Sequence, residues 1–155
     1  MKFEIKVDTK QLEQKIKDTE KQIKQGVEQG LKVCASEMKL HEQRLIEQRT
    51  GHGEYQPTGY LKHSVWIMPL EWSPYGASIT VTNVAKYALY TEFGTGKYAS
   101  DGNGRLGGWV YPVGDGTFVF TEGMPPKFFV RDTRNFYDEA RVKAIVEEQI
   151  YKCIK

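Results

Sequence analysis

The stretch that decides the fold is residues 9–49, which read TKQLEQKIKDTEKQIKQGVEQGLKVCASEMKLHEQRLIEQR. Its apolar side chains recur at spacings of three, four or seven residues, and Lys, Glu and Gln fill most of the positions between them. The apolar positions are Leu12, Ile16, Ile23, Val27, Leu31, Cys34, Met38 and Leu45. This period is typical of an amphipathic α-helix, so we predict one long helix from Thr9 to near Arg49.

A helix of this length is longer than the core of a small domain can cover. About forty residues at about 1.5 Å each extend about 60 Å, so we expect part of the apolar stripe to pack on another subunit. Gly26 and Gly30 lie four residues apart within the helix, and each weakens it by about 1 kcal/mol relative to Ala. The pair marks either a bend or a close contact with another helix, and the sequence leaves both open.

Outside the long helix, runs with a period of two predict short strands. The expected strands are residues 3–7, 64–68, 77–81, 109–111 and 117–120. Turn residues at 73–76 and 112–116 join the last four into two hairpins. A broken alternation at residues 84–93 favours a short helix that closes at Gly94.

The remaining segments complete the expected architecture. Residues 94–108 are rich in Gly, Ser, Asn and Asp and have almost nothing to bury, so we expect a mobile loop. Pro125 and Pro126 begin a last helix, whose apolar side is formed by Phe129, Phe136, Ala140, Ile145, Ile150 and Cys153. The fold class is therefore α+β: an antiparallel sheet of about four to five strands flanked by a long N-terminal helix, a short middle helix and a C-terminal helix.

Composition limits the class of protein. A chain of 155 residues with 39% hydrophobic and 27% charged residues fits one globular domain over residues 1–155. The formal net charge is only +2, smaller than the excess that a dedicated phosphate-backbone binder usually carries. Cys34 and Cys153 lie far apart in apolar helical patterns, so we predict buried thiols without a disulfide or metal site. The absence of a long apolar run or signal-like N-terminus predicts no membrane contact and a cytosolic protein.

No residue pattern predicts an active site, a metal site or a cofactor. Residues 102–107 match G-x-G-x-x-G, but a loop precedes them and a strand follows, whereas a dinucleotide site needs a strand before the turn and a helix after it. The three histidines, His41, His52 and His63, lack further ligands at metal spacing. Glu92 and Glu122 look exposed and are more often helix caps or ion-pair partners than general acids. We therefore expect no enzymatic activity.

Aromatic side chains are dense between positions 87 and 129, and few basic residues lie among them. Base stacking normally requires such basic residues, so core packing and subunit contacts are favoured. Phe128 and Phe129 are adjacent at the start of the last helix, where side chains diverge by about 100°. We expect Phe129 in the core and Phe128 at a subunit surface.

Four short motifs occur in order across residues 58–130. They are Thr58-Gly59-x-Leu61-x-x-Ser64-Val65; Asn83 followed by Tyr87-Ala88-x-Tyr90-x-Glu92-Phe93-Gly94-Thr95-Gly96; Gly108-Trp109-Val110-Tyr111; and Thr121-x-Gly123-Met124-x-Pro126-x-Phe128-Phe129. In these motifs the chain resembles the neck and tail-completion proteins of tailed bacteriophages and prophages, the gene-product-ten-like head–tail connection or minor tail proteins. Lys127 is a departure, because proline and phenylalanine are often adjacent in that family.

The resemblance implies a structural role in virion assembly in the host cytoplasm, with the protein then part of the virion neck or tail. Its partners would be further copies in a homo-oligomeric ring and the neighbouring head-closure and tail proteins, with genomic DNA passing non-specifically. The interface candidates are Tyr90, Glu92, Phe93, Thr95, Lys97, Arg105, Trp109 and Phe128. Two other classes stay open: a small nucleic-acid-binding module, which would show a basic face, and a small hydrolase, which would need a deep pocket with a perturbed acid or histidine.

Overall fold

The computed structural model describes residues 9–50, 58–114 and 116–154, so the strand expected at residues 3–7 and His52 lie outside the described residues. The elements are α1 (Thr9–Thr50), α2 (Tyr60–His63), β1 (Val65–Ile67), β2 (Glu71–Ser73), β3 (Gly76–Ser78), β4 (Val81–Asn83), α3 (Ala88–Phe93), the 3-10 turn η1 (Gly96–Tyr98), β5 (Trp109–Pro112), β6 (Phe118–Thr121), α4 (Phe129–Phe136) and α5 (Glu139–Cys153). The α+β class predicted from the sequence is confirmed.

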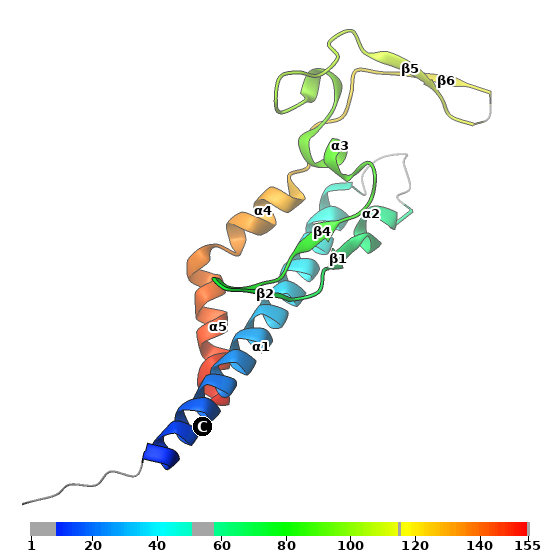
Figure 1. Cartoon of the computed structure of the whole chain (residues 1–155). Helices are drawn as coiled ribbons and strands as arrows, with labels where there is room; N and C mark the ends of the chain where they lie inside the picture. The colour runs from blue at the N-terminus through cyan, green and yellow to red at the C-terminus, as the bar shows by residue number, and fades with distance from the viewer. Residues whose placement is uncertain (1–8, 51–57, 115, 155) are drawn as a thin grey trace, which may run out of the picture.

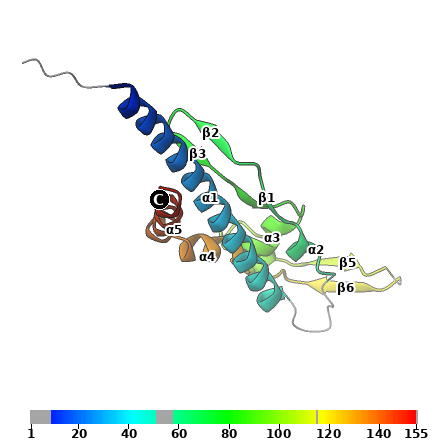
Figure 2. The ribbon, with the colours of Figure 1, turned by 90° about the horizontal axis from the view of Figure 1, so that it is seen from below.

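Helix α1 is the spine of the molecule. It runs as one continuous helix (Figure 1), with α4 and α5 along one side and the β1–β4 strands along the other (Figure 2). Gly26 and Gly30 are buried where α5 crosses α1. A Cβ at Gly26 would lie 2.5 Å from the Ile150 Cα, and one at Gly30 would lie 2.7 Å from the Val146 Cα. The glycine pair therefore marks a close helix contact, which resolves the alternative that the sequence left open.

The strands differ from the single sheet predicted above. In the described residues they form three separate two-stranded antiparallel ladders, β1–β4, β2–β3 and β5–β6. The first two ladders are successive parts of one long hairpin that turns between Ser73 and Gly76, as predicted. Pro69 interrupts the strand between β1 and β2, because proline has no N–H to give to a ladder. No described strand joins β5–β6 to this hairpin.

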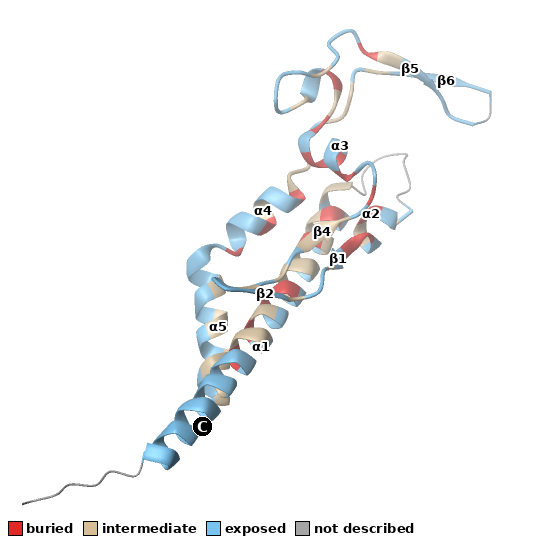
Figure 3. Cartoon of the chain, in the orientation of Figure 1, coloured by how far each residue is buried: buried red, intermediate tan, exposed pale blue. Residues whose placement is uncertain are grey.

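The core lies around the C-terminal half of α1. Its buried members are Ile46, Leu61, Val65, Ala85, Ala88 and Phe129, and Figure 3 shows the buried residues concentrated there. Phe129 is 0% exposed, as predicted. Cys34 is buried as expected, whereas Cys153 is half-buried, and both thiols are free.

The last helix is broken, which corrects the prediction of one helix to Cys153. Helix α4 ends at Phe136 and α5 begins at Glu139. The Asp138 side chain accepts a hydrogen bond from the Arg141 N–H at 2.9 Å and so caps α5. Phe136 is fixed at the break: the His41 ring stacks on it at 4.5 Å, and the Arg141 guanidinium lies 4.2 Å from its centroid. The break therefore coincides with the Asp138 cap and with the contact of Phe136 on His41 of α1.

Candidate functional site

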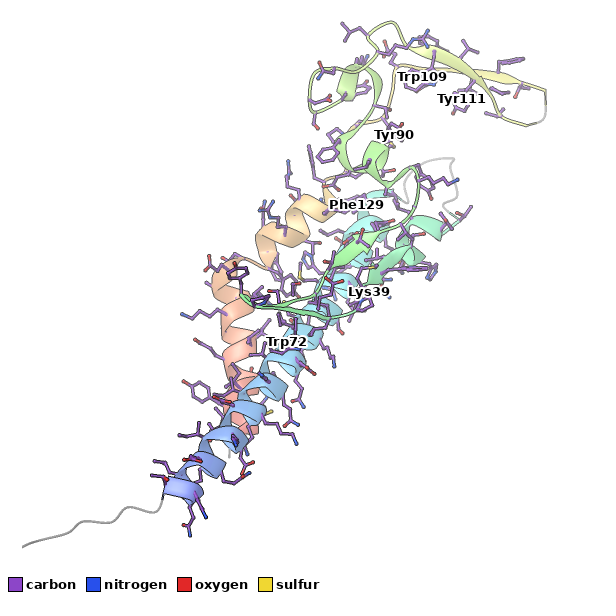
Figure 4. The ribbon with its side chains drawn as sticks, viewed as in Figure 1. Lys39, Trp72, Tyr90, Trp109, Tyr111 and Phe129 are labelled. Carbon is purple, nitrogen blue, oxygen red and sulfur yellow. The ribbon has the colours of Figure 1, made fainter. Side chains whose placement is uncertain are left out.

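Residues 94–126 form an arm that stands away from the helical body (Figure 1). Its outer part is the β5–β6 ladder, in which Trp109 pairs with Thr121, Val110 with Phe120, Tyr111 with Val119 and Pro112 with Phe118. Among the described elements, this ladder makes extensive contact with none but itself. Figure 4 shows Trp109 and Tyr111 on the arm and Tyr90 at its base.

Both faces of the β5–β6 ladder are apolar and open. Side chains alternate between the faces of a strand, so Val110 and Phe120 lie on one face and Tyr111 and Val119 on the other. All four are exposed, and Phe118 is 70% exposed. From Leu106 to Thr121 the only charged residue in the sequence is Asp115. A two-stranded ladder of this kind is at best marginally stable in water. Packing against a partner surface would bury its apolar side chains and stabilise it.

Glu92 fixes the base of the arm. The sequence suggested an exposed carboxylate and a contact residue, but Glu92 is only 4% exposed, which is a correction. Its two oxygens accept hydrogen bonds from the N–H groups of Val130 at 3.0 Å and Arg131 at 2.9 Å. These are free donors in the first turn of α4, and a carboxylate there also favours the helix dipole. Glu92 is therefore a helix cap supplied from another element, the role considered above as its alternative.

The chain entering the arm is hydrogen-bonded to the chain leaving it. Thr95 donates its N–H to the Met124 carbonyl at 2.9 Å, and its hydroxyl accepts from the Met124 N–H at 3.0 Å. At Gly96 and Gly123 the two backbones touch so closely that a Cβ on either would overlap the opposite carbonyl. Thr95 is thus a joint in the arm rather than a free contact residue. Mobility of residues 94–108 stays a prediction, with residues 95–100 now tied by backbone hydrogen bonds.

The other interface candidates are distributed over the arm and its base. Tyr90 and Phe93 are exposed on α3, at 64% and 47%, and Arg105 is exposed on the loop. Lys97 forms an ion pair with Glu122 and lies 5.0 Å from the Tyr98 ring centroid. The ion pair raises the pKa of Lys97.

The last two candidates, Trp109 and Phe128, are half-buried. Trp109 lies at the start of β5, and Phe128 lies at the N-terminus of α4 with the Arg131 guanidinium 3.5 Å from its ring centroid. Phe128 has a left-handed backbone with φ 48°, which turns the chain so that Phe129 alone enters the core.

Although the aromatic residues of the arm are assigned to core packing or subunit contacts, the interface candidates named from the sequence leave out the residues that make the arm apolar on both faces. They are Val110, Tyr111, Phe118, Val119 and Phe120, all exposed. The signal was present as two apolar strands without a charged residue in either, since natural exposed strands usually carry charges at their edges.

The described residues contain little that suggests catalysis. No group of three His, Cys, Asp or Glu side chains among them is placed to hold a metal ion. His41 is hydrogen-bonded to the Thr133 hydroxyl at 3.1 Å, and His63 is exposed. Residues 102–107 form turns that lead into β5, so the context of a dinucleotide site is missing. Across residues 9–50, 58–114 and 116–154, no helix has the length and apolar character needed to cross a membrane.

A groove lies between the body and the base of the arm. It is about 870 Å³ in volume, and its lining includes Arg49, Tyr60, Tyr87 and Lys127. Arg49 is already bound to Asp132 at 2.8 Å and to the Lys127 carbonyl at 2.7 Å. Because the groove borders a segment outside the described residues, we assign it no role.

Comparison with protein-family models, with curated proteins and with solved structures finds no match.

Proposed function

We propose that this chain is a structural virion-assembly protein at the head–tail junction of a tailed phage or prophage, where it forms or joins a ring through which the genome passes. The observation that carries the proposal is the arm, whose two chains are hydrogen-bonded to each other at Thr95 and Met124 and whose apolar ladder makes no extensive contact with another described element. A heterologous contact between the arm of one copy and the next copy generates a ring when the rotation closes.

The surface area of the chain supports assembly. It exposes 11,920 Å², whereas a compact monomeric protein of 17.8 kDa exposes about 8,000 Å². The excess shows an extended chain, with room for the two contacts of about 800 Å² on each subunit that a ring of standard interfaces needs.

Residues of the motifs that carry the phage resemblance lie at the base of the arm and at the contacts between its two chains. Glu92 caps α4, Thr95 and Gly96 meet Gly123 and Met124, and Gly108 lies against Thr121. A family that shared these motifs would share the joint that sets the direction of the arm. In a ring, that direction decides which neighbour the arm reaches.

The experiment compares the assembly of three proteins by analytical ultracentrifugation and negative-stain electron microscopy. Wild type is expected to form closed rings. V110S/F120S, which changes one face of the arm, is expected to lose them. The control L40S/Y151S removes two exposed apolar side chains from α1 and α5 and is expected to keep them. Rings that survive V110S/F120S, or a wild-type chain that is monomeric with and without phage neck proteins, would overturn the proposal.

Two further observations separate this proposal from the other classes. Portal, major-capsid and tail-tube genes beside the gene would support the phage role. A gel shift with duplex DNA that weakens steeply with salt, for a chain that forms no ring, would instead favour the nucleic-acid-binding module.

A further inference from the structure

The first four turns of α1 carry an apolar line that no described element covers. Leu12, Ile16 and Ile23 are 56%, 51% and 39% exposed. Together with Thr19 they are spaced by four, three and four residues, which is the spacing of a coiled-coil seam. We call Leu12, Ile16, Thr19 and Ile23 the α1 seam. The Thr19 hydroxyl donates to the Lys15 carbonyl at 2.8 Å, so covering the seam need not leave it unpaired.

The α1 seam continues an interface already present in the chain. Three and seven residues beyond Ile23 the same line reaches Gly26 and Gly30, which the backbone of α5 covers at Ile150 and Val146. Helix α5 ends at Cys153, so the line is closed from Gly26 onward and open before it. One seven-residue repeat thus runs along α1, and α5 covers it only from Gly26 onward. Figure 3 shows the first turns of α1 as exposed.

We infer that the α1 seam is covered by the α1 seam of a second copy, in an antiparallel pair. Leu12, Ile16, Thr19 and Ile23 have the a/d spacing with which two helices pair, and the space around Gly26 decides their orientation. A parallel partner would have to continue past Ile23 into the space that α5 occupies at Gly26, whereas an antiparallel partner helix begins there. Leu12 would then lie against the partner's Ile23, and Ile16 against the partner's Thr19.

Charge makes the orientation testable. In the heptad that places Ile16 and Ile23 at position a, Glu13 and Glu20 are both at position e and Lys15 is at position g. An antiparallel pair places Glu13 beside the partner's Glu20, and each of these carboxylates lies four residues before a lysine of its own helix, which moderates the repulsion. A parallel pair would place Lys15 beside the partner's Glu20. Glu20→Lys therefore strengthens an antiparallel pair and weakens a parallel one.

The contact is independent of the proposed ring, because it lies at the end of the molecule away from the arm (Figure 1). About fifteen helical residues pair over only about 22 Å, so we expect a concentration-dependent dimer rather than an obligate one. A chain with the arm variant V110S/F120S should still dimerise, and a ring-forming chain should double its mass through the seam.

The test measures mass against concentration by sedimentation equilibrium in the V110S/F120S background. We expect a monomer–dimer equilibrium that I16K/I23K abolishes and that the control Q11K/Q25K, with the same added charge on exposed positions off the seam, leaves unchanged. Glu20→Lys is expected to tighten the dimer about tenfold, because it changes two exposed contacts between like charges into contacts between opposite charges.

Three outcomes would overturn the inference. The first is a chain that stays monomeric at the highest concentration reached. The second is weakening of the dimer by Glu20→Lys, which contradicts the antiparallel arrangement. The third is a chain that stays monomeric and whose melting temperature falls equally in I16K/I23K and in a chain without residues 1–8. The N-terminal residues of the same chain would then cover the α1 seam.

Discussion

Two buried carboxylates, Glu42 and Glu92, lie in the same part of the core and differ in how they are satisfied. Glu92 gives both oxygens to N–H groups of α4. Glu42 is 3% exposed, and its Oε1 atom has no hydrogen-bond partner. An ionised carboxylate without full hydrogen bonding is costly in such a place. The two residues should therefore respond in opposite ways to removal of charge.

Replacing Glu92 by Ala should destabilise the protein, because two first-turn N–H groups of α4 lose their acceptors. We expect the free energy of unfolding to fall by about 2 to 3 kcal/mol. Glu92→Gln keeps one acceptor oxygen and should cost less. Urea denaturation measures the change, with Glu122→Ala as control, since this exposed acid in the Lys97 ion pair should cost below about 1 kcal/mol. Equal losses for Glu92→Ala and Glu122→Ala would contradict the capping role.

Glu42 should make stability fall as the pH rises through neutrality. Burial raises its pKa to about 7, with a smaller contribution from the charge of Glu92 and an opposing one from a hydrogen bond to Asn83. Below its ordinary pKa of 4.5 both states hold the proton. Between that value and about 7 only the folded state holds it, so the unfolding free energy declines, by about 3 kcal/mol in all.

Glu42→Gln removes this titration, so wild type should lose stability relative to the variant from about pH 5 to about pH 8. Urea unfolding curves across that range measure the free energy of unfolding of both proteins. The difference between the two values removes the contribution of groups that titrate in both. Curves that run parallel for the two proteins would mean that Glu42 is ionised in the fold.

At the scale of elements, the α1–α5 contact depends on the two glycines. Gly30→Ala should destabilise although alanine gains about 1 kcal/mol in helix propensity, because its Cβ would lie 2.7 Å from the Val146 backbone. We expect a net loss of about 1 to 3 kcal/mol from forcing the helices apart. Gly107→Ala is the control, since nothing lies within 4 Å of its added Cβ. Thermal melts that show stabilisation by Gly30→Ala would show that the helices separate freely.

Elements with a strong local signal could be predicted, and elements set by packing could not. The apolar period of α1 and the turn residues at 73–76 and 112–116 are local sequence signals. The long helix and the two hairpins that they predict are present in the structure. The break between α4 and α5 depends on the stacking of Phe136 between His41 and Arg141. His41 is almost a hundred residues away, so no window of sequence contains that contact; the Asp138 cap of α5 is the local part of the signal. The division of the strands into separate ladders is non-local in the same way.

The N-terminus of α4 separates two adjacent phenylalanines. Phe129 is fully buried, so Phe129→Ala should lower the unfolding free energy by about 3 to 5 kcal/mol. Phe128→Ala removes a half-buried ring under Arg131 and should leave the chain folded, while weakening ring formation if Phe128 is a contact. Differential scanning calorimetry with ultracentrifugation measures both effects. Equal destabilisation, with assembly intact in the folded fraction, would contradict this division.

At the scale of the whole molecule, the sequence predicted contact residues on the arm and at its base, and the structure shows which of them are exposed. Tyr90, Phe93 and Arg105 are exposed as contact residues must be, whereas Glu92 and Thr95 hold the arm in place. A glutamate followed by glycines looks exposed in sequence, because its capping partners lie about forty residues further along. The projection of β5–β6 away from the body could not be predicted either. It depends on a lack of tertiary contacts, which no sequence pattern shows.

Hydrogen exchange should therefore divide the isolated chain into two parts. Amides open with free energies that follow local burial, and the β5–β6 ladder is exposed on both faces and makes no extensive contact with another described element. Its amides should exchange within seconds to minutes in the monomer, whereas those of α1 around Ile46 should exchange only with global unfolding. In assembled rings the ladder should become protected and residues 101–107 should change with it. Ladder amides as slow as those of α1 in a monomer would mean that the arm needs no partner, and the proposed ring contact would then lose its physical basis.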